Sequence, residues 1–235
     1  MRHCLLPLLF LLLAPAHAQE EPAPTVLPDP VGQVMYVRQS PADRVAAGWL
    51  ALVAKRPDLS GSAFVGTPSL GWTGVIVRAL ERTEPEVSSG VSKELSKNLK
   101  APVLHLILSE DGRAWYFYWD KGQLVDRYCS NPGRPGEVPI EQVRSWQGRP
   151  ELLLPVASGT PLSKLRSEVS ITDFNAFLYS YYPEMKVERP GAWRMPADLM
   201  AMLVQVMGVS HTPAPYLSMK SQPGWTRIAP AAPGE

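Results

Sequence analysis

The chain has 235 residues, with 23 lysines and arginines against 22 aspartates and glutamates, so its net charge is close to zero. No segment concentrates basic residues, which argues against nucleic acid as a partner and against a strong electrostatic hold on an anionic membrane. The length is sufficient for one domain to bury a hydrophobic core of its own.

The first eighteen residues, MRHCLLPLLFLLLAPAHA, have the three regions of a secretory signal peptide. Arg2 and His3 are basic, residues 5–13 are apolar, and residues 16–18 match the small-x-small pattern of a signal peptidase site. The apolar run is much shorter than the ~20 residues that span a bilayer. We therefore expect cleavage, export to the periplasm, cell envelope or medium, and no transmembrane segment in the mature chain. An uncleaved signal that keeps the protein on the membrane is the alternative.

Cleavage of the signal would remove Cys4 and leave Cys129 as the one cysteine of the mature chain. Exported compartments permit disulfides, but a single cysteine cannot form an internal one. The fold must therefore rest on its hydrophobic core.

Proline-rich segments predict the domain boundaries. Residues 19–39 begin QEEPAPTVLPDP and are predicted to be an extended linker, because proline interrupts helices and weakens strand pairing. Residues 211–235 have the same bias and are predicted to be a tail. Both segments fit spacers, and the alternative is that a partner binds them as proline-rich peptides. The globular domain is expected to cover residues 40–210.

The first predicted elements of this domain are a helix, a strand and a second helix. Ser40 and Pro41 suit the start of a helix over residues 40–56. Its apolar stripe is Val45, Trp49, Leu52 and Val53. Residues 71–80, GWTGVIVRAL, read as a strand. Residues 85–100 predict a helix in which Val87, Val91, Leu95 and Leu99 recur every four residues.

Three strands in quick succession, over residues 102–108, 113–119 and 123–129, predict an antiparallel meander. Asp111-Gly112 is a strong hairpin signal between the first two strands. In the middle strand, alternation places Trp115, Phe117 and Trp119 on one face and Tyr116 and Tyr118 on the other. The aromatic side chains could form a stacking platform for a sugar or base, or a buried core between helices.

The pattern after the meander is helical. Apolar residues at helical spacing indicate helices within residues 139–159, 160–170, 172–185 and 195–208, with Gly208 placed to end the last one. The fold class predicted from the whole pattern is α+β, an antiparallel β-meander packed with several helices, mostly C-terminal to the sheet.

Two stretches carry a resemblance to known proteins. SKELSKNLKAPVLHLIL (92–108), followed by YFYWDKGQLVDRYCSNPG (116–133), resembles a globular module of uncharacterised bacterial proteins, in which a Leu-Ser-Lys helix precedes a meander ending in a G-x-L-V-D-R-Y-x-S-x-P-like run. The resemblance covers roughly residues 70–210 and implies a shared fold without implying a reaction. In that module the position of Cys129 commonly carries a small polar residue, so this sequence departs from the pattern there.

The candidate site lies where the last predicted strand ends. Asp126, Arg127, Ser130 and Asn131 offer charge and hydrogen bonds there, for binding or for local stabilisation of a turn and an edge strand. Alternation predicts Leu124, Asp126 and Tyr128 on one face and Val125, Arg127 and Cys129 on the other, so the Asp126 and Arg127 side chains should point apart.

A catalytic Cys129 would need a base within hydrogen-bond reach. His105 lies two predicted strands away and His211 lies in the predicted tail. No nucleophile elbow and no pair of histidines at metal-ligand spacing occurs. The sequence therefore favours an exported, non-enzymatic binding domain without metal or cofactor, whose partner is a protein or a small ligand; no oligomeric state is predicted. The alternative is a thiol-dependent or other hydrolase that uses Cys129, with His105 as base.

Overall fold

The computed structural model describes residues 32–109, 113–130, 141, 145–146, 148–149, 152–158 and 196–228. The predicted signal peptide, Asn131, and the helices predicted over 160–170 and 172–185 lie outside the described residues.

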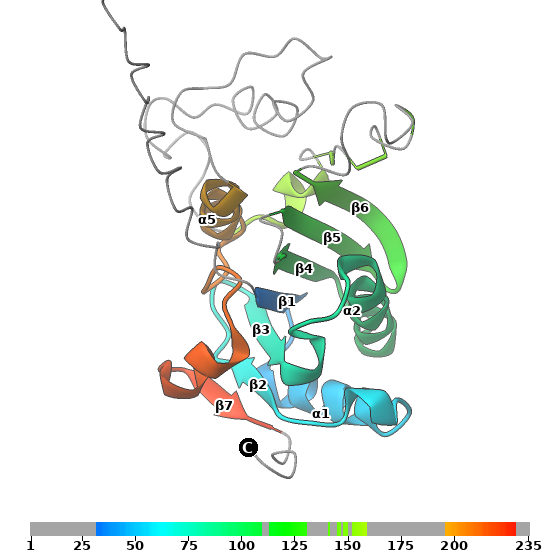
Figure 1. The fold of residues 1–235 in the computed structure, drawn as a ribbon, viewed down its shortest axis with the longest axis vertical. Helices are drawn as coiled ribbons and strands as arrows, with labels where there is room; N and C mark the ends of the chain where they lie inside the picture. Colours follow the sequence, from blue (N-terminus) through cyan, green and yellow to red (C-terminus); the bar gives the residue numbers. More distant parts are fainter. Residues whose placement is uncertain are drawn as a thin grey trace, which may run out of the picture.

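The described residues form a seven-stranded antiparallel sheet with the strand order β6-β5-β4-β1-β3-β2-β7 (Figure 1). The strands are β1 Gly32–Arg38, β2 Ala63–Gly66, β3 Trp72–Val77, β4 Val103–Leu108, β5 Ala114–Asp120, β6 Gln123–Cys129 and β7 Trp225–Arg227. The sheet and its helices make the described part of the chain an α+β fold, as predicted.

The α-helices that lie wholly within the described residues are α1 Ala42–Val53, α2 Pro85–Leu99 and α5 Pro196–Met207. Short 3₁₀ helices are η1 Pro57–Leu59, η2 Arg78–Leu80, η4 Leu154–Val156 and η7 Tyr216–Ser221. Since α1 and α2 precede β4, the expectation that most helices follow the sheet is not confirmed within these residues. No helix in the described part of the chain is long and apolar enough to cross a bilayer.

The sheet is covered on both faces. On one face α1 and α2 pack over the odd-numbered residues of β1, around the fully buried Trp49 and Leu95. On the other face α5 packs over Tyr36 and Tyr116 through Leu203 and its neighbours (Figure 1). A sheet buried on both faces contains strands without polar alternation, which describes β1, β4 and β5 here.

The predicted meander is confirmed as β4, β5 and β6, which pair as neighbours in that order. The turn between β5 and β6 uses Lys121 and Gly122 with φ of 50° and 82°, as a tight hairpin turn requires. All five aromatic residues of β5 alternate between the faces as predicted, and none is more than 9 % exposed. They are core side chains in this fold, which leaves no exposed aromatic platform on β5.

The predicted domain boundaries need correction at both ends. Gly32–Arg38, placed in the linker by the sequence, is the central strand β1, with six residue pairs to β4 and four to β3. Trp225–Arg227, placed in the tail, is the edge strand β7, and the preceding η7 buries Tyr216 and Met219 in the core. The ordered fold therefore extends beyond residues 40–210 in both directions.

Candidate functional site

Asp126 lies on the α5 face of β6 and is only 5 % exposed. Its Oδ2 accepts hydrogen bonds from the Tyr116 hydroxyl and the Arg149 backbone N–H, each at 2.7 Å. Burial raises the pKa of the Asp126 carboxyl, against the opposing effect of these hydrogen bonds and of the Arg149 guanidinium, whose Nε lies 3.7 Å from Oδ1. Asp126 is therefore a buried hydrogen-bond acceptor rather than an exposed binding group.

Arg127 points to the opposite, α2 face, as strand alternation predicts. Its guanidinium lies 4.0 Å from the centre of the Trp146 ring, a cation–π distance. It also donates to the Ser145 carbonyl at 3.0 Å and to the Ser145 hydroxyl at 2.9 Å. Asp126 and Arg127 thus hold the same segment of the chain from the two faces of the sheet.

We call this segment, Ser145 to Arg149 with Ser145, Trp146, Gly148 and Arg149 described, the clasp. It crosses the outer edge of β6, where the Cys129 N–H donates to the Trp146 carbonyl at 2.9 Å. The Arg149 guanidinium donates to the Val125 carbonyl at 2.7 Å. Gly148 has φ 74° and packs so closely on the Tyr116 hydroxyl that a side chain would not fit.

The alternation predicted along β6 fails at its first half. The register with β5 shifts between Tyr118 and Trp119, which leaves Val125 as the extra residue of a β-bulge. Val125 consequently packs with Asp126 against the α5-side core rather than on the face of Arg127. A single-residue insertion reverses the faces of all preceding residues, so Leu124 also departs from the predicted pattern.

The other two predicted binding residues lie at the end of β6. The Ser130 hydroxyl accepts the Ala114 N–H at 3.0 Å and the Ser130 N–H donates to the Ala114 carbonyl at 2.9 Å, so Ser130 extends the β5–β6 pairing. Asn131 lies outside the described residues. The structure brings Asp126, Arg127 and Ser130 together as supports of the strand edge, and their role in binding a partner stays a prediction.

Cys129 and His105 are both completely buried. They share the α2 face, but Cys129 pairs with Trp115 and His105 pairs with Phe117, so β5 separates their strands. With strands about 4.8 Å apart, this places the backbones of β4 and β6 about 10 Å from each other. Burial lowers the pKa of His105 to about 3. The pair therefore lacks both the proximity and the basicity that a thiol–imidazole site needs near neutral pH.

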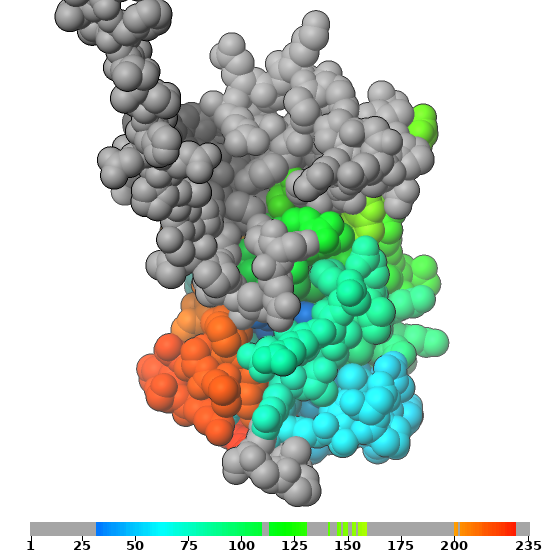
Figure 2. All heavy atoms as spheres, in the orientation of Figure 1, coloured from blue at the N-terminus to red at the C-terminus, as the bar shows by residue number. Residues whose placement is uncertain are grey.

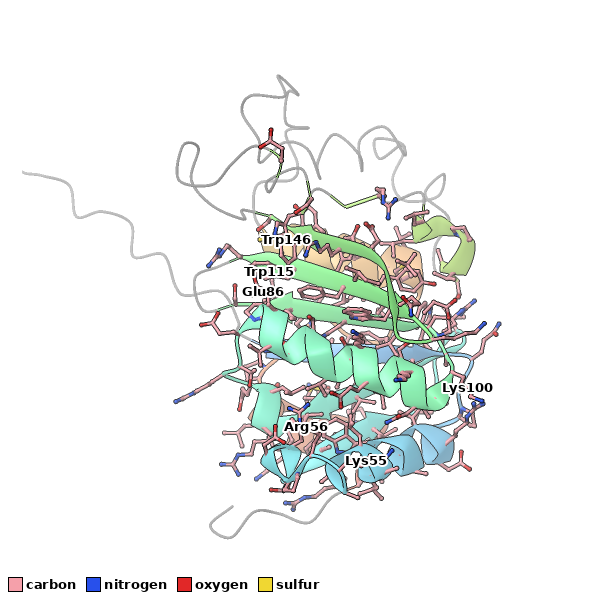
Figure 3. All side chains as sticks on the ribbon, turned by 90° about the vertical axis from the view of Figure 1, so that its right-hand side faces the viewer. Lys55, Arg56, Glu86, Lys100, Trp115 and Trp146 are labelled. Atoms are coloured by element: carbon pink, nitrogen blue, oxygen red, sulfur yellow. The ribbon has the colours of Figure 1, made fainter. Side chains whose placement is uncertain are left out.

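A pocket of about 300 Å³ opens beside the end of the meander that carries Cys129. Ile107 and Trp115 provide apolar lining, and Trp146 packs edge-on to Trp115 at 5.1 Å between ring centres. Figure 3 shows Glu86 at the start of α2 close to Trp115, with Trp146 beyond it. The polar lining consists of Glu81, Arg82, Thr83, Glu84, Glu86, Ser109 and Arg113.

The wall of this pocket is fixed by residues from both ends of the fold. The Gln33 side-chain amide of β1 donates to the carbonyls of Leu80 and Thr83 at 2.8 and 3.0 Å. The Tyr216 N–H donates to Glu81 Oε1 at 3.0 Å, and Figure 2 shows the C-terminal segment against the segment that leads into α2. The two segments predicted as linker and tail therefore position the pocket.

The pocket combines charges of both signs. Glu84 and Glu86 are exposed and form no ion pair with described residues. The Arg113 guanidinium lies 5.4 Å from the centre of the Trp115 ring. Among the described residues no group of three His, Cys, Asp or Glu side chains is arranged to hold a metal ion.

Sequence reasoning missed Trp146, Arg149 and the pocket residues. Trp146 falls within the helical segment predicted over residues 139–159, and that pattern does not indicate that its ring packs on Trp115 and Phe117 and under Arg127. The loop 81–86 carries no motif, and its charged residues become a pocket only because β4 and β5 end beside it. No family model, no curated protein and no solved structure matches the chain, so the resemblance to the bacterial module stays a prediction.

Asp126→Ala should lower the free energy of unfolding by about 2 kcal/mol, because the buried Tyr116 hydroxyl would lose its acceptor. Urea denaturation measures this change. The Asp126→Asn variant tests the direction in which the Asp126 carboxyl changes stability with pH. Since the pKa of Asp126 is raised in the fold, the wild type should gain stability over Asp126→Asn as the pH falls towards 3.8.

Asp58→Asn is the matched control for the sign of this effect. Its hydrogen bond from Arg56 lowers the pKa of Asp58, so the wild type should lose stability relative to Asp58→Asn on acidification. The interpretation of Asp126 would be wrong if, on acidification, the stability of the wild type changed in the same direction relative to Asp126→Asn and to Asp58→Asn.

Proposed function

We propose that this chain is an exported, non-enzymatic binding domain whose ligand site is the pocket between the segment 81–86 and the β4–β5 hairpin. Residues 1–18 support export, since they have the pattern of a cleaved signal peptide. The observation that carries the binding site is the pocket itself, which joins an aromatic wall to a charged rim.

The arrangement of Cys129 and His105 favours binding over thiol chemistry. Both side chains are completely buried, and a strand lies between them. A nucleophile must meet its substrate and its base at hydrogen-bond distance. Cys129 lies opposite Trp115 in the pairing of β5 with β6 and is completely buried, so it does not line the pocket.

The chemistry of the pocket favours a small ligand that carries charges of both signs on an apolar body. Glu84 and Glu86 suit a positively charged amine, while Arg82 suits a carboxylate. Ile107 and Trp115 suit an apolar side chain between them. A volume of about 300 Å³ is at the lower end for ligand pockets, which fits an amino acid or a short peptide.

The test uses protein recovered from cells that make the full chain. Its mass should correspond to a chain that begins at Gln19, and amino acids and dipeptides are then titrated into it by calorimetry. Glu84→Gln with Glu86→Gln should weaken the binding of the best ligand about tenfold, the loss of about 1.4 kcal/mol expected from charge-assisted contacts.

Asp43→Asn is the matched control, because Asp43 and Glu86 are both exposed acidic residues in the first turn of a helix and only Glu86 lines the pocket. It should leave binding unchanged. Absence of binding by any zwitterion, or equal losses in the control and the pocket variants, would contradict the proposed site.

A further inference from the structure

The outer edge of β6 is the feature that the proposed function leaves unexplained. Among the strands of the described residues, β6 is the last in the sheet order and pairs with β5 alone. An edge strand presents unpaired backbone N–H and C=O groups, which are a template for pairing with another chain. In this protein two of those groups, the Cys129 N–H and the Val125 carbonyl, are bonded to the clasp.

The contacts of the clasp come from both faces of the sheet. Arg127 binds Ser145 and Trp146 on the α2 face, and Asp126 binds the Arg149 N–H on the α5 face. Trp146 is 7 % exposed, so the contact is a packed one. A segment held on both sides of the strand blocks access to the two edge groups that it occupies, the Cys129 N–H and the Val125 carbonyl.

The positions of the Cys129 N–H and the Val125 carbonyl would suit pairing with β6 of a second copy of this chain. Suppose that β6 of a second copy ran antiparallel to β6, about a two-fold axis at Arg127. The Val125 carbonyl of the second copy would then lie opposite the Cys129 N–H of the first, and the Val125 carbonyl of the first opposite the Cys129 N–H of the second. Both groups that the clasp occupies would then be satisfied between copies, as in an isologous dimer. Arg127 would face the Arg127 of the second copy, which opposes pairing as long as the arginine is present.

We propose that the clasp is an edge cover, which keeps the β6 edge from pairing with β6 of a second copy of this chain. The bulge at Val125 disrupts the regular spacing of backbone groups on the same edge, which further opposes pairing with another strand. Arg127 contributes twice, because it anchors the clasp and because it repels its counterpart. This proposal is independent of the ligand pocket.

The decisive variant is Arg127→Thr in the full chain, since threonine is a good strand former and removes both effects. Both copies must open their clasps before they pair, so the apparent association constant of the dimer falls with the square of the fraction of open molecules. Loss of about 1.4 kcal/mol of clasp binding, which is a factor of about ten in each copy, should therefore raise the dimer association constant about a hundredfold. Light scattering on size-exclusion fractions measures it. Arg56→Thr is the matched control, because it removes the ion pairs of Arg56 with Asp58 and Glu94 and leaves the β6 edge intact. Its dimer association constant should equal that of the wild type.

Two further variants separate edge pairing from other causes of association. Leu124 lies on β6 and is 42 % exposed, so Leu124→Lys adds a charge to the edge and should return Arg127→Thr to a monomer. Arg149→Ala removes an exposed arginine of the clasp and keeps Arg127. Its dimer should be weaker than that of Arg127→Thr and should strengthen with salt, which screens the repulsion.

The proposal is overturned if Arg127→Thr associates no more than the wild type, or if its dimer persists with Leu124→Lys. If Arg127→Thr fails to fold, Arg149→Ala decides by the same criteria: a salt-strengthened dimer supports the edge cover, and a monomer at all salt concentrations overturns it.

Discussion

A chain that begins at Ser40 should fail to fold, whereas a chain that begins at Val31 should fold. The difference between them is β1, which lies between β3 and β4 and joins the two halves of the sheet. Removal of β1 would expose the inner edges of both neighbouring strands. The meander and the β2–β3 hairpin would then have no common sheet.

The loss of side-chain burial points the same way. Val34, Met35, Tyr36 and Val37 are each at most 1 % exposed, two on each face of the sheet. At about 1.5–3 kcal/mol for each buried apolar side chain, their removal costs about as much as the whole 5–15 kcal/mol stability of a typical domain. Gln33, which fixes the pocket wall, is lost as well.

Circular dichroism and urea denaturation distinguish the two chains. The Val31 chain should show a cooperative transition, and the Ser40 chain should show none. A cooperative transition in the Ser40 chain would mean that β1 is dispensable and that the globular unit does begin where the sequence predicted.

The failure to predict β1 has a physical cause. A central strand buried on both faces lacks the polar alternation that identifies half-buried strands. The run Val-Met-Tyr-Val is short and follows four prolines within residues 19–30, and proline at that density predicts an extended linker. The meander was predictable because its hairpin signals are local, whereas the place of β1 depends on contacts about seventy residues along the chain.

The candidate site was predictable only in part for the same reason. Strand alternation correctly predicts that Asp126 and Arg127 point to opposite faces, because the period of two is a local property. It cannot predict that both hold the clasp, since Trp146 and Arg149 come from a separate segment. The bulge at Val125 also escaped prediction, because an extra residue is defined by its partner strand.

His105 illustrates how a buried residue can mimic a functional one in a sequence. The single histidine in the meander suggested a base for Cys129, yet neither ring nitrogen has a hydrogen-bond partner among the described residues. Its ring lies between apolar neighbours, with Phe117 at 6.3 Å between ring centres. An unpaired buried polar group costs about 1–3 kcal/mol. His105→Leu, close in volume, should therefore raise the free energy of unfolding by about 2 kcal/mol near neutral pH.

The pH dependence makes this expectation specific. The pKa of His105 is about 3 in the fold against 6.5 unfolded, so on acidification the unfolded chain binds the proton first and the wild type loses stability. From pH 6.5 to about pH 4 the loss approaches roughly 3 kcal/mol at 1.36 kcal/mol per unit. Urea denaturation of the wild type and His105→Leu should show their difference widening by that amount.

His211→Leu is the control for this widening. Burial lowers the pKa of His211 as well, but the residue is partly exposed beside Trp225, so the effect on stability should be smaller. A difference between wild type and His105→Leu that stays constant with pH would mean that the His105 ring can be protonated inside the fold. That result would reopen the question of a base in the meander, because protonation there requires access to solvent or to an acidic partner.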